Sequence, residues 1–178
     1  MKTLLVFRNS LAALLVVGIS QTVFAADIFS VVIKRVLDGD TVEISNMKQH
    51  VRLASIDAPE GSHGHGKPGQ PFSQASTQHL QHLLARGPVT MACYDEDRYN
   101  RPVCELFVSG LSANKQMVID GMAWANTSAR GRYLRDRSLL VAQSQATAAK
   151  KGIWSQSAIE PWNWRSDCWK NKVCIIEN

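Results

Sequence analysis

Two short β-prone stretches, VLDGDTVEI at 36–44 and VRLASIDAPE at 51–60, constrain this chain most, because carboxylates cluster at their ends. Apolar and polar residues alternate in the first stretch, which is typical of a strand with one buried face. Aspartate is disfavoured inside strands, so each acidic group belongs to a turn or to a site. Each group taken alone is an ordinary turn sequence. If the two strands are neighbours, however, the acidic groups converge.

The second stretch predicts one strand that continues to Ile56. The expected alternation places Arg52, Ala54 and Ile56 on one face and Val51, Leu53 and Ser55 on the other. An arginine on such an apolar face usually pairs with a carboxylate. The functional alternative is a phosphate clamp, because a guanidinium binds phosphate oxygens through two parallel hydrogen bonds.

The four clustered carboxylates are Asp38, Asp40, Asp57 and Glu60. They repel one another unless a cation lies among them. Oxygen donors without sulfur suit Ca²⁺ or Mg²⁺, and the spacing is not that of an EF-hand loop. A cation, two arginines and a free carboxylate form a set that can cleave a phosphodiester. The cation and arginines neutralise the transition state, and the carboxylate activates or orients water.

The rest of the chain predicts helices and one hairpin. A glycine- and proline-rich loop at 61–71 is followed by a helix that continues to Leu84, a hairpin at 89–108, a helix from Ser112 to Gly121 and a helix from about Leu134 to Lys151. Leu139, Leu140, Ala142, Ala146 and Ala149 are the expected buried stripe of the last helix. This order predicts an α+β domain built around a small antiparallel sheet or barrel.

The four cysteines form an even set, for which disulfides are the default in an exported protein. The zinc alternative is disfavoured because no C-x-x-C pair exists. If the hairpin turns at Arg98-Tyr99, Cys93 and Cys104 lie opposite each other, close enough for a bridge. We therefore expect Cys93–Cys104, which leaves Cys168–Cys174 as the second pair.

Four motifs in order, LDGDTVEI, VRLASIDAPE, DRYNR and KKGIWS, resemble the thermonuclease family of staphylococcal-nuclease-like domains. The resemblance extends from Ile28 to Ser155. It implies a five-stranded OB-type barrel with three helices, and an endonuclease that hydrolyses DNA and RNA with little sequence preference, using Ca²⁺. Asn100 stands where the best-known member has glycine, and the family's base-stacking tyrosine has no clear counterpart here. Trp124 and Tyr133 are the candidate replacements.

The resemblance also implies roles for particular residues. Arg52, Glu60 and Arg101 match the catalytic residues; Asp40, Asp57 and the Ala58 carbonyl match the calcium ligands; Asp38 matches the outer-shell aspartate; and Arg98 and Tyr99 match the residues that contact a terminal phosphate. Glu60 is then the general base or the group that orients water. The rival from another class is a non-catalytic OB-fold module that only binds nucleic acid. A second rival is a structural domain stabilised by calcium, which leaves both arginines unexplained.

The first 25 residues resemble a secretory signal, with a basic start, an apolar run and a cleavage site after Ala25. The apolar run is short for a bilayer span, which needs about 20 apolar residues. We therefore expect an exported protein, periplasmic or secreted, that is a monomer without stable membrane association after cleavage. The formal charge of +5 includes Lys2 and Arg8, so the mature chain is mildly basic and compatible with a polyanionic partner.

The expected mature protein has a thermonuclease-like domain at 26–155 and a tail at 156–178 rich in tryptophan and cysteine. Large aromatic residues mostly serve burial, so Trp162, Trp164 and Trp169 are expected to pack the tail on the domain rather than to stack on bases. His63 and His65 lie in the glycine-rich loop, where solvated side chains are more common than metal ligands.

Overall fold

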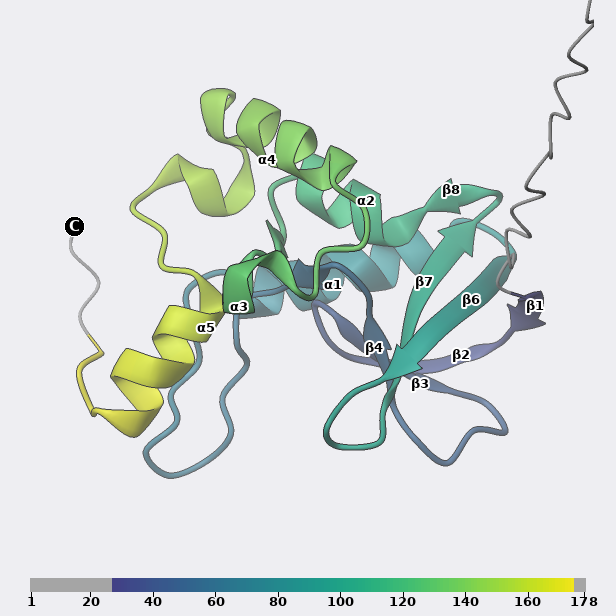
Figure 1. The fold of residues 1–178 in the computed structure, drawn as a ribbon, viewed down its shortest axis with the longest axis horizontal. Coiled ribbons are helices and arrows are strands. Elements are labelled where there is room, and N and C mark those ends of the chain that lie inside the picture. The colour runs from purple at the N-terminus through teal and green to yellow at the C-terminus, as the bar shows by residue number, and fades with distance from the viewer. Residues whose placement is uncertain (1–26, 175–178) are drawn as a thin grey trace, which may run out of the picture.

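The structure is a computed structural model that describes residues 27–174 (Figure 1). The signal peptide expected at 1–25 lies outside the described residues. Among the residues described, no helix has the length and apolar character needed to span a membrane.

The strands form one large sheet and one small one. The main sheet has the order β1-β6-β7-β4-β3-β2, with β8 added beside β7. Its members are β1 (Ile28–Val31), β2 (Ile33–Asp38), β3 (Thr41–Ile44), β4 (Val51–Leu53), β6 (Val89–Glu96), β7 (Pro102–Val108) and β8 (Leu111–Ser112). Strands β4 and β7 pair in parallel, and the other pairs are antiparallel. The small sheet pairs β5 (Ile56–Asp57) with β9 (Trp124–Ala125).

The mixed α+β class is confirmed, but the closed five-stranded barrel is not. Strands β1 and β2 end the strand order on opposite sides, and within residues 27–174 they do not pair with each other. The sheet therefore stays open between two strands that are adjacent in sequence.

The three expected helices are α1 (Ser73–Leu84), α2 (Ala113–Ile119) and α4 (Ser138–Ala148). Two short helices were not predicted, α3 (Ser128–Gly131) and α5 (Pro161–Trp164), so the described residues hold five α-helices rather than three. A 3₁₀ turn, η1 (Gly152–Ser155), follows α4, and a π-helical turn, η2 (Arg165–Lys170), continues α5. Figure 1 shows the helices gathered on the side of the sheet away from β1.

Helix α4 is shorter than predicted at both ends, and part of its expected buried stripe is wrong. Leu139, Ala142 and Ala146 are buried, whereas Leu140 and Ala149 are exposed. Helix α4 packs on α2 and β9, and that contact needs only a narrow stripe of small and branched side chains.

The core lies between the main sheet and helices α1, α2 and α4. Its fully buried side chains include Val42 and Leu53 from the sheet, Leu80 from α1 and Met117 from α2. Helix α1 packs on β2 and α2, and α2 packs on β7. This core fixes the turn between β2 and β3, which carries Asp38 and Asp40, and the segment from β5 onward, which carries Asp57 and Glu60.

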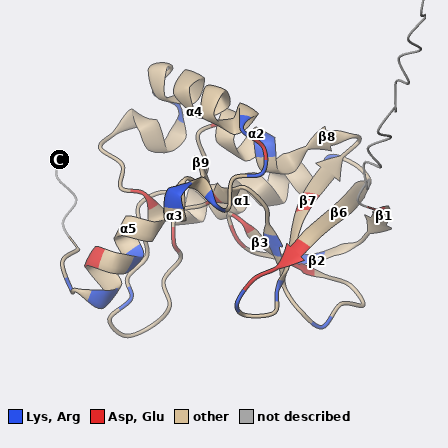
Figure 2. Ribbon diagram, in the orientation of Figure 1, with Lys and Arg blue, Asp and Glu red and all other residues tan. Residues whose placement is uncertain are grey.

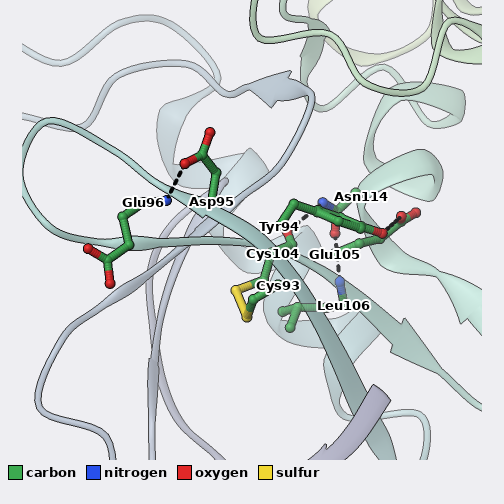
Figure 3. Close-up of a disulfide and its surroundings, with 8 residues drawn as sticks. All are labelled: Cys93, Tyr94, Asp95, Glu96, Cys104, Glu105, Leu106 and Asn114. Carbon is green, nitrogen blue, oxygen red and sulfur yellow. Dashed lines mark hydrogen bonds between the residues drawn. A yellow bond between two sulfur atoms is a disulfide. The ribbon is translucent and has the colours of Figure 1, made fainter. Parts of the chain in front are cut away.

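The hairpin of β6 and β7 pairs Cys93 with Cys104 as predicted, whereas nearer the tip its register is shifted by one residue. Cys93 lies opposite Cys104 and the two form a disulfide (Figure 3). Cys168 forms the second disulfide with Cys174. A bulge follows Cys93, so Asp95 pairs with Val103. Both predicted disulfides are therefore present.

The single strand predicted from Val51 to Ile56 is wrong. Strand β4 ends at Leu53, and Ser55 has a left-handed backbone with a φ of 66°. The side chain of Asn114, buried in α2, donates to the carbonyls of Ala54 and Cys104 at 3.0 and 3.1 Å and accepts from Leu106 N–H at 3.1 Å. Figure 3 shows Asn114 beside Cys104 and Leu106. Because Asn114 satisfies these buried groups, the chain can leave the main sheet at Ala54.

Candidate active site

The turn between β2 and β3 carries the first two aspartates. The Asp40 N–H donates to Asp38 Oδ1 at 3.0 Å, which closes the turn around Gly39. A Cβ on Gly39 would lie 1.9 Å from Ser76 Oγ and 2.7 Å from Ala58 Cβ. Ser76 is fully buried in α1 and donates to the Met122 carbonyl at 2.7 Å, so it cannot easily move aside. Only glycine therefore lets the acidic turn approach α1 and the chain after β5.

Arg52 joins the two acidic segments. Its Nη1 forms an ion pair with Asp40 Oδ1, and its Nη2 donates to Asp57 Oδ1 at 2.8 Å and to the Ile56 carbonyl at 3.2 Å. Asp40 and Asp57 are 6% and 1% exposed. Buried carboxylates are costly unless they are paired, so Arg52 holds both acidic segments at the end of the sheet.

The turn at Ser55 makes this contact possible. In the predicted strand, Asp57 would continue away from Arg52 along β4. Instead, β5 leaves the main sheet and pairs with β9, and Asn126 N–H donates to the Ser55 carbonyl at 2.8 Å. Asp57 thereby returns toward the arginine five residues before it.

A second arginine, Arg165 of η2, binds the other side of this acidic group. Its Nη2 donates to Asp57 Oδ2 at 2.8 Å, its Nη1 donates to Asp57 Oδ1 at 3.2 Å, and Nη1 also contacts Glu60 Oε1. Arg165 was not predicted as a site residue. The tail has no clear period, and an arginine 108 residues away from Asp57 carries no local signal.

The two oxygens of Glu60 are in different surroundings. Oε1 contacts Arg165, whereas Oε2 lies 3.9 Å from His63 Nε2, beyond hydrogen-bonding distance. Burial raises the pKa of Glu60, and the Arg165 guanidinium partly offsets this effect. Glu60 thus has one anchored oxygen and one oxygen that is available to a water molecule.

Burial also raises the pKa of Asp38, while Arg52 and, more weakly, Arg101 favour its charged form. Arg101 therefore lies near enough to act electrostatically on the acidic turn. Within the described residues, however, its ion pair is with Asp97 and not with this turn.

The predicted residues Arg98, Tyr99 and Arg101 lie together at the tip of the β6–β7 hairpin. The Tyr99 ring is 63% exposed and lies 4.9 Å from the Arg98 guanidinium and 5.5 Å from that of Arg101. Arg101 Nε donates to Asp97 Oδ2 at 2.7 Å. Burial acts to raise the pKa of Asp97, but the hydrogen bonds from Arg101 outweigh it and leave that pKa below its ordinary value. Figure 2 shows acidic and basic segments side by side at this tip.

Asn100 has a left-handed backbone, with a φ of 58°. Its N–H donates to the Asp97 carbonyl at 2.9 Å, which closes the turn. Asparagine tolerates this conformation better than most residues. Asparagine at this position therefore allows a tight turn before Arg101.

The oxygen donors suit a hard cation in their chemistry. Asp40 and Asp57 both contact one guanidinium, so their carboxylates face a common point. Yet Asp40 Oδ2 accepts from Ala58 N–H at 2.6 Å, and both Asp57 oxygens accept from arginines. Over residues 27–174, no three His, Cys, Asp or Glu side chains are grouped as for a metal ion. A cation bound here would share the carboxylates with Arg52 and Arg165.

The two aromatic candidates for base stacking differ in exposure. Trp124 is 3% exposed and packs edge-on against Trp154, with ring centres 5.5 Å apart, so it cannot stack on a base in this structure. Tyr133 is 53% exposed. In the tail, Trp164 is buried and Trp162 and Trp169 are half-buried.

Comparison with known proteins identifies the family of the chain. Residues 50–156 match the family described as staphylococcal nuclease homologue. An uncharacterized endonuclease of Escherichia coli O157:H7 is 35% identical over 82% of this chain and 90% of its own length. A micrococcal nuclease of Shigella flexneri is 32% identical over 93% of this chain and 95% of its own. An uncharacterized endonuclease of Haemophilus influenzae is 36% identical over 74% of this chain and 70% of its own length.

The matched range 50–156 spans the positions of Arg52, Asp57, Glu60 and Arg101, and the similarity to these relatives covers most of the chain. The chain therefore belongs to the staphylococcal nuclease family.

Proposed function

We propose that the protein is an exported, monomeric, Ca²⁺-dependent nuclease of the thermonuclease type that hydrolyses DNA and RNA with little sequence specificity. The observation that carries the proposal is the arrangement at Glu60. One oxygen is anchored and the other is available, beside an arginine fixed between two buried aspartates. Relatives named endonuclease and micrococcal nuclease support the reaction class.

In this proposal, Glu60 Oε2 accepts a proton from the attacking water, whose oxygen forms a bond to phosphorus. Arg52 binds the non-bridging phosphate oxygens and neutralises the charge that develops on them. Both terminal nitrogens of Arg52 already contact Asp40, Asp57 or the Ile56 carbonyl, so bound phosphate would have to share the guanidinium with them. The phosphorus–oxygen bond to the leaving group then breaks.

Arg101 stabilises the leaving oxygen, and Arg98 and Tyr99 contact a terminal phosphate. The tip that carries these three residues has its own internal contacts, with Asp97 and across the Tyr99 ring. Bound phosphate would compete with Asp97 for the guanidinium of Arg101. This part of the site is therefore proposed to engage only when substrate is present.

Asp40, Asp57 and the Ala58 carbonyl would hold Ca²⁺, with Asp38 acting through water. The ion supplies positive charge beside the scissile phosphate. Asp57 is held by two arginines in the structure, so the proposal requires that its carboxylate be shared between them and the ion.

The two disulfides support export, because such bonds persist mainly in oxidising compartments. Periplasm and medium both fit. A monomer without stable membrane association after signal cleavage completes the proposal, as does a division into a domain at 26–155 and a tail at 156–178.

The test is degradation of single-stranded DNA and of RNA by the purified protein with Ca²⁺ or with a chelator. The Glu60→Gln variant is assayed in parallel. Glu43→Gln is the matched control, because Glu43 pairs with Lys34 and Arg35 on the face of the sheet and contacts none of the site residues. We expect cleavage of both polymers by the wild type and the control. Chelation and Glu60→Gln should each abolish it.

Cleavage that survives chelation would contradict the calcium requirement alone. Binding of DNA without cleavage by the wild type would favour the non-catalytic binding module. Unfolding by the chelator would favour the calcium-stabilised structural domain.

A further inference from the structure

We infer that Arg165 is a positioning residue of the candidate active site, which it enters from the C-terminal tail to hold Glu60 and Asp57 in place. The inference rests on the proposed function and assigns a task to a part of the chain beyond the matched residues 50–156. Figure 1 shows the yellow tail lying beside the loop that follows β5.

The first observation is the geometry of the guanidinium. Arg165 donates to both oxygens of Asp57 and contacts one oxygen of Glu60. Like charges on these two carboxylates raise the cost of keeping both ionised and close together. A guanidinium between them removes that repulsion and fixes the direction of each carboxylate.

The second observation is that the backbone of Glu60 is fixed by the same segment of tail. Gln70, which is buried, accepts from Glu60 N–H at 3.1 Å through its side chain, and its own N–H donates to the Glu60 carbonyl at 2.8 Å. The Gln70 Nε2 in turn donates to the Ile159 carbonyl. The tail therefore contacts Glu60 directly through Arg165 and indirectly through Gln70.

The third observation is that the tail is fastened to the loop at 61–71. The indole N–H groups of Trp164 and Trp169 both donate to the Pro68 carbonyl, at 3.2 and 2.9 Å. Lys172 Nζ donates to the Gly66 carbonyl at 3.1 Å, and His63 packs edge-on against Trp169. The Cys168–Cys174 disulfide closes the tail on itself. Arg165 therefore belongs to a segment whose position is held by hydrogen bonds to the loop at 61–71 and by the disulfide.

The orientation of Glu60 gives this arrangement a catalytic consequence. Because Arg165 holds Oε1, Oε2 is the oxygen left for water. If Glu60 were displaced, the rate of cleavage should fall more than substrate affinity, because the position of a general base matters most in the transition state.

The experiment compares the full-length mature wild type with Arg165→Gln and Arg165→Lys, with kcat and KM measured separately on single-stranded DNA. Arg35→Gln is the matched control, because it removes the same charge from an arginine whose ion pair within residues 27–174 is with Glu43. Thermal unfolding of all four proteins reports whether each is folded at the assay temperature.

We expect Arg165→Gln to lower kcat on the order of 10- to 100-fold with KM changed by less than about threefold, as for a misplaced catalytic group. Arg165→Lys should recover part of kcat, because it restores the charge without the two-pronged geometry. Arg35→Gln should behave as the wild type. If Arg165→Gln is unfolded, Arg165→Lys tests the inference by itself, and its kcat should be lower than that of the wild type.

A kcat for both Arg165 variants equal to that of the wild type would overturn the inference. A higher kcat would overturn it too, by indicating that Arg165 blocks the site. An increase in KM alone would instead assign Arg165 to phosphate binding. Each of these results leaves the nuclease proposal standing, whereas a folded wild type that does not cleave DNA overturns both.

Discussion

The two arginines predicted as catalytic, Arg52 and Arg101, are held in contrasting ways. Arg52 is 15% exposed and bridges two buried aspartates that come from different turns. Arg101 is 29% exposed and pairs with Asp97, four residues away in its own hairpin. The first is part of what holds the fold together, whereas the second is attached to a local turn.

This difference separates stability from catalysis at the two positions. Removing Arg52 leaves the buried Asp40 without its arginine and leaves Asp57 with Arg165 alone, and such a loss is costly because the buried charges cannot reach water. Removing Arg101 leaves Asp97 close to solvent, where hydration replaces the ion pair. The two substitutions should therefore cost similar activity but very different stability.

The largest expected effect on stability is that of Arg52→Gln. We expect it to lower the free energy of unfolding by about 3 kcal/mol or more, since it breaks a buried charge network. Cleavage should fall below detection as well. Chemical denaturation measures the first quantity, and Arg52→Lys should lie between the variant and the wild type. An Arg52→Gln protein as stable as the wild type would remove the distinction between the two arginines.

The disulfide beneath the Arg101 hairpin should have the next largest effect. Replacing Cys93 and Cys104 by alanine opens a loop with a sequence separation of 11 residues, for which loss of about 3 kcal/mol is expected. Because the hairpin carries Arg101, activity should decrease more than calcium affinity. Thermal unfolding, cleavage rate and calcium titration of the double variant test this. An unchanged melting temperature and cleavage rate would show that the disulfide does not stabilise the hairpin tip that carries Arg101.

Gly39→Ala tests how tightly the Arg52 region is packed. The added methyl meets the buried Ser76, so the acidic turn must move or α1 must shift. We expect a cost of about 1–3 kcal/mol, as for other overpacked sites. Gly61→Ala is the control, because nothing lies within 4 Å of a Cβ at that position. Equal melting temperatures for the two variants would contradict the close approach.

Arg101→Gln should have the smallest effect on stability, below about 1 kcal/mol for a partly exposed ion pair. It should still lower the rate of cleavage strongly, because the positive charge at the leaving oxygen is lost. Denaturation and kcat measured on the same preparation test both statements. A loss of stability comparable to that of Arg52→Gln would mean that the hairpin tip is part of the structural network.

Local patterns predicted the hairpin well. A turn centred on Arg98-Tyr99 predicts that Cys93 lies opposite Cys104. The structure keeps this pair although the turn closes between Asp97 and Arg101, because a bulge after Cys93 takes up one residue. The meeting of the two acidic segments was also expected, because β3 and β4 are joined by a short turn and pair with each other.

The features that failed to be predicted depend on contacts distant in sequence. The end of β4 at Leu53 depends on Asn114, 60 residues beyond Ala54, which binds the released carbonyl. The contact of Arg165 with Asp57 depends on how the tail packs on the loop after Glu60. The open edge between β1 and β2 could not be read from strand-forming residues, which indicate strands but not their closure.

The most direct measurement is binding and single-turnover cleavage of one labelled single-stranded DNA by the wild type and by Glu60→Gln, with Ca²⁺ present. Glu60 is proposed to act on water rather than to hold the polymer. The variant should therefore bind DNA as the wild type does, while its cleavage rate falls roughly 10²- to 10⁴-fold. Equal cleavage rates for the two proteins would contradict the proposed role of Glu60 and, with it, the proposed mechanism.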